Sequence, residues 1–191
     1  MPIEYVNRKG QRYYLHAGET KTGKSKYFFS MSESGTPMDT IPPGFEIYEN
    51  PNGQVFLRKA LPKLISDEEL EIVEREVRRF AHLKDSRLDR KLEVLTVYVV
   101  DQSETLFEDL RLMGEWNGRA NIDDVLSRFR TYSPKLQFVL LDSEKRIFQA
   151  RRYCYRSFVD DWMYIGAPGT IAALTREYIK HLKQDSYYEL F

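Results

Sequence analysis

The chain has few of the residues that usually build catalytic or metal centres. It contains one cysteine and three histidines among 191 residues. The single cysteine, Cys154, excludes an intrachain disulfide and predicts a reducing compartment. The histidines at positions 16, 82 and 181 do not show zinc-ligand spacing with one another or with Cys154. The sequence therefore predicts no zinc site and no cofactor.

Net charge and long apolar runs are also missing. The 29 basic and 29 acidic residues balance, so no overall field attracts nucleic acid or a membrane, and only a local patch can do so. The apolar stretch 95–100 is far shorter than the roughly 20 residues that span a bilayer. The first residues lack the basic and apolar segments of a signal peptide. We expect a cytoplasmic protein with no membrane association.

Hydrophobic residues make up 42% of the chain and aromatic residues 14%, which is enough for a folded core. Residues 1–62 predict a β-rich module of about four strands, because aromatic and β-branched runs alternate with turn signals. One hairpin joins 11–16 to 26–30, and a second joins 45–48 to 54–58 through an Asn-Gly turn.

Residues 63–191 predict an α+β body, in which a mixed sheet is flanked by helices. The clearest helix is 66–82, where Ser66 and Glu69 form a capping box ahead of an apolar face. The other expected elements are strands at 92–100, 136–141, 146–155 and 162–165, and helices at 103–113, near 121–129 and after 168. The fold class is therefore α+β, with the domain boundary near 60–66.

One segment matches the phosphate-loop pattern G-x-x-x-x-G-K-[ST] through Gly18, Gly23, Lys24 and Ser25. Such a loop wraps phosphates with its backbone amides and opens a helix directly afterwards. Here the following residues are aromatic and strand-like, which favours a hairpin loop. A nucleotide-binding enzyme that uses residues 18–25 is therefore the alternative hypothesis rather than the preferred one.

Acidic residues offer a second route to phosphate chemistry. Asp142, Glu144 and Asp161 could supply oxygen ligands for Mg²⁺ in a nuclease-like hydrolase. Ordinary turn chemistry at 142–145 competes with this interpretation, because aspartate is favoured at the first position of a turn.

Aromatic and basic residues interleave in two places, which is typical of sheets that stack bases and hold phosphates. The first lies on the N-terminal hairpin, and the second includes residues 151–156. A solvated sheet face with edge tyrosines is the competing interpretation. The candidate binding residues are Arg12, Tyr14, Lys21, Lys24, Lys26, Tyr27 and Arg152.

Three stretches together resemble a set of small uncharacterised bacterial proteins: 5–10 running into 20–24, then 41–51, then 152–156 with 160–162. The resemblance implies a bacterial cytosolic setting and no particular activity. The preferred hypothesis is a non-catalytic binding protein whose partner is nucleic acid or another protein. The oligomeric state does not follow from the sequence.

Overall fold

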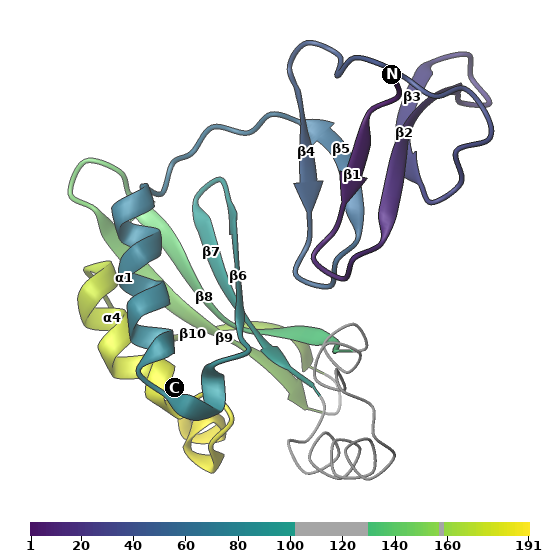
Figure 1. Ribbon diagram of the computed structural model, residues 1–191. Helices are drawn as coiled ribbons and strands as arrows, with labels where there is room; N and C mark the ends of the chain where they lie inside the picture. The colour runs from purple at the N-terminus through teal and green to yellow at the C-terminus, as the bar shows by residue number, and fades with distance from the viewer. Residues whose placement is uncertain (102–129, 157–158) are drawn as a thin grey trace, which may run out of the picture. The chain divides into compact units, whose positions relative to one another are not determined.

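The computed structural model describes residues 1–101, 130–156 and 159–191, and its contacts divide the described residues into two compact units (Figure 1). The first unit contains residues 1–60, and the second contains 61–101 and 131–191. The strands are β1 (Glu4–Val6), β2 (Arg12–Glu19), β3 (Ser25–Ser30), β4 (Phe45–Glu49), β5 (Val55–Lys59), β6 (Arg87–Lys91), β7 (Val94–Val100), β8 (Tyr132–Asp142), β9 (Ile147–Arg156) and β10 (Val159–Gly169). The helices are α1 (Asp67–Arg78) and α4 (Ile171–Tyr178), with short 3-10 turns at Ala81–Leu83, Ile179–His181 and Asp185–Glu189.

The first unit contains a three-stranded antiparallel sheet, β1-β2-β3, and the separate hairpin β4-β5. Gly23 turns the β2-β3 hairpin with a φ of 74°, a left-handed conformation that suits glycine. The buried Asn7 amide donates to the carbonyl oxygen of Gly53 at 2.6 Å, which fixes the β4-β5 turn against the loop that precedes β2. Leu15 and Val55 are buried within this unit.

The second unit is built on a five-stranded sheet in the order β10-β9-β8-β7-β6. Every neighbouring pair is antiparallel. The sequence predicted a mixed sheet, and this detail was wrong. Short connections such as the turn between β8 and β9 can join only antiparallel neighbours, because a parallel pair needs a crossover of a dozen or more residues.

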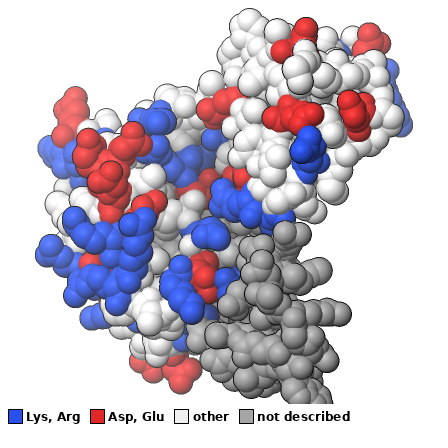
Figure 2. All heavy atoms as spheres, in the orientation of Figure 1, with Lys and Arg blue, Asp and Glu red and all other residues white. Residues whose placement is uncertain are grey.

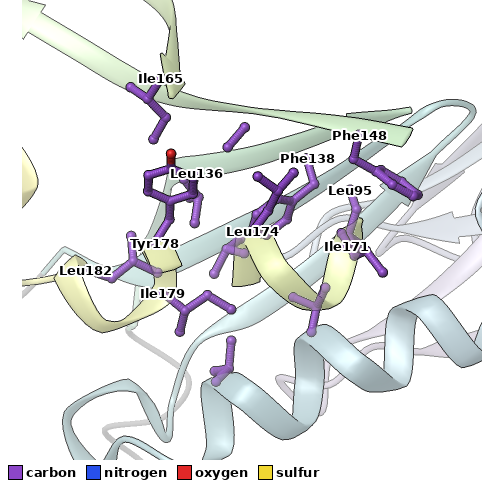
Figure 3. Close-up of a cluster of buried hydrophobic side chains, with 14 of the residues drawn as sticks. Leu95, Leu136, Phe138, Phe148, Ile165, Ile171, Leu174, Tyr178, Ile179 and Leu182 are labelled. Atoms are coloured by element: carbon purple, nitrogen blue, oxygen red, sulfur yellow. The ribbon is translucent and has the colours of Figure 1, made fainter. Parts of the chain in front are cut away.

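Both helices pack against one face of this sheet (Figure 1). The capping box forms as predicted: the Glu69 amide donates to Ser66 Oγ at 3.2 Å, and the Ser66 amide donates to Glu69 Oε2 at 2.9 Å. Thr170 caps α4 by accepting from the Ala173 amide. The core between helices and sheet includes Leu95, Leu136, Phe138, Phe148, Ile165, Ile171, Leu174 and Ile179 (Figure 3).

The α+β class predicted from the sequence is confirmed, with sheets plus the helices α1 and α4. Strands β1 and β6 were missed, since β6 has the polar sequence Arg-Leu-Asp-Arg-Lys and carries little strand signal. The helices expected at 103–113 and near 121–129 lie outside the described residues. No helix within the described residues is long and apolar enough to cross a bilayer.

Candidate nucleic-acid interface

Some of the predicted binding residues share one face of the N-terminal sheet. Strand pairing places Arg12, Tyr14 and Lys26 on the same side, because side chains alternate along each strand and the register aligns His16 with Phe28. Lys26 Nζ lies 5.5 Å from the centroid of the Phe28 ring, whose side chain is 39% exposed. This face therefore offers an accessible ring beside a cation. Arg12 contributes less charge, because its guanidinium pairs with Glu4 at 2.8 Å.

Lys21 and Lys24 lie in the turn at the tip of the β2-β3 hairpin, where both residues are exposed. Tyr27 does not share the face of Lys26. Its alternate position in β3 directs it to the opposite face, where its ring meets the Phe45 ring edge-on with centroids 5.5 Å apart. Tyr27 therefore helps to pack the two parts of the first unit together, and its ring is only partly exposed.

The phosphate-loop residues lie in this same hairpin. The amide of Thr20 donates to the carbonyl of Lys24 at 2.8 Å, and the amide of Gly23 donates to the carbonyl of Thr20 at 2.9 Å, which closes the turn. Gly18 is part of strand β2, and Ser25 begins strand β3. A phosphate loop is followed directly by a helix, but here the residues that follow form strand β3. The local geometry is therefore that of a hairpin turn.

Asp161 lies far from the other two acidic candidates, Asp142 and Glu144. Asp142 Oδ1 accepts from the backbone amides of Glu144 and Lys145, both at 2.9 Å, which is ordinary turn chemistry. Asp161 lies in β10 opposite Cys154, whereas Asp142 lies opposite Ile147. Seven residues along β9 separate these partners, which corresponds to about 23 Å at roughly 3.3 Å per residue. Within the described residues, no group of three His, Cys, Asp or Glu side chains is placed to hold a metal ion.

Arg152 is buried in the second unit, with 5% of its surface exposed. Its Nε donates to the carbonyl of Leu190 at 2.8 Å, and its guanidinium lies 5.7 Å from the ring centroid of Tyr187. The structure therefore places Arg152 under the C-terminal residues, where it holds the end of the chain against the sheet.

The preceding residue, Arg151, points to the other face of the same strand, away from the described helices α1 and α4. Its Nε donates to Gln137 Oε1 at 2.6 Å, and Gln137 in turn donates to the Thr96 hydroxyl at 2.9 Å. This series of hydrogen bonds runs across strands β9, β8 and β7 and fixes the position of the Arg151 guanidinium above the sheet. A charged donor held by such a chain is preorganised for binding.

Aromatic rings surround Arg151 on this open face. The guanidinium carbon lies 5.5 Å from the ring centroid of Trp162 and 6.0 Å from that of Tyr164. Trp162 meets Tyr153 edge-on with centroids 5.2 Å apart. Tyr164 is 59% exposed and Tyr155 is 83% exposed. We call the surface formed by Arg151, Tyr153, Tyr155, Trp162 and Tyr164 the open aromatic face.

Asp160 limits the positive charge of the open aromatic face. The Tyr153 hydroxyl donates to Asp160, and this hydrogen bond raises the pKa of Tyr153 above its usual value because the neutral phenol is the donor. Tyr153 therefore stays a neutral ring at physiological pH, and Arg151 provides the cation beside it.

The sequence pattern pointed to this region through residues 151–156, but it selected Arg152 instead of Arg151 and did not include Trp162 or Tyr164. Arg151 is distinguished from Arg152 by the period of two along a strand, since residues 151, 153 and 155 share one face and residue 152 lies on the other. Which of the two faces lies beneath the helices depends on tertiary packing. The chain matches no protein-family model, and comparisons with curated proteins and with solved structures likewise give no match.

Proposed function

We propose that this protein is a non-catalytic binding protein and that the open aromatic face binds single-stranded nucleic acid. The supporting observation is Arg151, held 5.5 Å and 6.0 Å from the ring centroids of Trp162 and Tyr164 on the sheet face opposite α1 and α4. Unpaired bases stack on aromatic rings and guanidinium planes, at roughly 1–3 kcal/mol per base. Tyr164 and Tyr155 on this face are 59% and 83% exposed, so their rings are accessible for stacking.

The lysine-bearing hairpin of the first unit is a second, separate candidate for phosphate contacts. Lys21, Lys24 and Lys26 are exposed, and Phe28 provides one accessible ring beside them. Because the whole chain has no net charge, attraction to nucleic acid must come from such local groups. A cytoplasmic location accords with the single, unpaired cysteine, which is buried.

A direct test is fluorescence anisotropy of the full chain with a labelled single-stranded RNA of about 15 nucleotides. Tyr164→Ala and Arg151→Ala should each weaken binding by about five- to a hundred-fold, since each removes one stacking partner worth roughly 1–3 kcal/mol. The matched control is Arg78→Ala, which removes the same charge from helix α1, where Arg78 pairs with Glu74 at 2.8 Å. Equal affinity of wild type and both face variants would contradict the proposal.

Salt dependence separates nucleic acid from a protein partner at the same face. Phosphate contacts release counterions, so affinity should fall steeply and log-linearly as salt rises. The double variant Lys24→Ala and Lys26→Ala should make this slope shallower by about 1.4, at roughly 0.7 per lost contact on a single strand. A protein partner that docks on the rings would instead be captured with little salt dependence and would leave RNA unbound.

A further inference from the structure

A groove runs between helices α1 and α4 on the outer side of the helix layer. It has a volume of about 270 Å³ and is lined by Ile72, Arg75, Glu76, Arg79, Ala172, Thr175 and Arg176. Arg75 and Arg79 are four residues apart on α1 and so lie on one face of it, while Arg176 comes from the neighbouring α4. Figure 2 shows Lys and Arg side chains gathered over the C-terminal half of α1.

The groove has an excess of positive charge. Its three guanidinium groups face one carboxylate, that of Glu76, which leaves two positive charges. Glu76 is 8% exposed and accepts from Arg79 Nη1 at 2.6 Å, so it is committed to Arg79. Arg75 and Arg176 are exposed and take part in none of the ion pairs among the described residues. Two uncompensated guanidinium groups, one from each helix, therefore border a shared hollow.

The floor of the groove is apolar. The Thr175 hydroxyl is turned inward and donates to the carbonyl of Ile171 at 2.9 Å, so the groove receives no hydroxyl from it. Ile72 and Ala172 are half-buried and provide the remaining floor. A cationic rim over an apolar floor suits a ligand that has an anionic head and a small organic body.

We infer that this groove is a binding site for a small organic phosphate. A phosphate monoester carries close to two negative charges, which matches the excess of the groove, and its oxygens can accept paired N–H bonds from guanidinium groups on opposite sides. The volume is close to the lower end of the range for small-molecule sites, roughly 300 Å³, and accommodates a phosphate with a short carbon chain. None of the residues that line the groove belongs to the open aromatic face.

The test is a titration of the full-length, ¹⁵N-labelled protein with glycerol phosphate, inorganic phosphate and malonate, each balanced with sodium chloride to constant ionic strength. Glycerol phosphate should give saturable shifts of amide signals on α1 and α4. Inorganic phosphate should shift the same signals with equal or lower affinity, which separates recognition of the head group from recognition of the ester. Malonate, a dicarboxylate of similar charge, should bind at least fivefold more weakly.

Matched charge-removal variants locate the site. Arg75→Gln and Arg176→Gln should each weaken glycerol phosphate binding at least tenfold, whereas Arg78→Gln on the same helix should change it less than twofold. Arg151→Ala should leave it unchanged, so failure of the nucleic-acid proposal and failure of this one are distinguishable. Unsaturable shifts, equal losses in all three helix variants, or malonate binding as tight as phosphate would overturn the inference.

Discussion

Arg151 and Arg152 are neighbours in strand β9 that face opposite sides of the sheet. Arg152→Ala should lower the free energy of unfolding by about 2–4 kcal/mol, because it removes charged hydrogen bonds and leaves a void and unpaired carbonyls near Leu190. Arg151→Ala should change it by at most about 1 kcal/mol, because its partners are more accessible to water. Urea unfolding of both variants measures the contrast, and similar losses would show that both arginines are structural.

Glu69 joins the start of α1 to the turn before β9. Burial disfavours the ionised form of the Glu69 carboxyl and so raises its pKa. The hydrogen bond from Arg146 Nε at 2.9 Å and the bond from the Ser66 amide favour the ionised form and outweigh burial. The pKa of Glu69 is therefore lowered from its ordinary 4.5. A lowered pKa stabilises the fold above the unfolded-state value, and this contribution disappears as pH falls through the folded-state value.

Glu69→Gln should therefore cost about 1–3 kcal/mol of stability at pH 7, while the amide keeps the capping box. The difference from wild type should shrink between about pH 5 and pH 3, as the wild-type carboxyl takes up its proton. Chemical denaturation across that range measures it. A difference that stays constant with pH would mean that the Arg146 contact contributes nothing electrostatic.

At the scale of the element, α1 depends on its cap. Ser66→Ala removes the acceptor for the Glu69 amide and should lower the unfolding free energy by about 1 kcal/mol. Ser143→Ala, in the exposed turn between β8 and β9, serves as the control and should change it by less than about 0.5 kcal/mol. Thermal unfolding followed by circular dichroism at 222 nm compares them, and equal midpoints would show that the cap is dispensable.

At the scale of the whole molecule, the described members of the hydrophobic cluster that joins α1, α4 and the five-stranded sheet all lie between Ile65 and Leu190. A fragment of residues 63–191 should therefore fold without residues 1–62, since it retains its whole core. Its urea transition should be cooperative, and its core amide signals should match those of the full chain. Strong dye binding to exposed apolar surface and a gradual transition would show that the two parts fold together.

Several features followed from local sequence. The Ser66/Glu69 capping box, the apolar face of α4 and the hairpin around Gly23 are set by neighbours within a few residues, so local patterns predicted them. Strand β6 was missed because its polar residues carry little strand preference and its pairing with β7 supplies the order. The sheet was predicted to be mixed, although its short turns favour antiparallel pairing.

The sequence by itself determined the α+β class, the helix start at Ser66 and the alternation that separates residue 151 from residue 152. Tertiary structure alone decided which side of β9 the helices cover, and so which arginine is buried and which lies among exposed rings. It also brought Arg75 beside Arg176, which are 101 positions apart along the chain. The physical reason is that periodicity fixes relative directions within an element, whereas packing between distant elements decides which direction faces water.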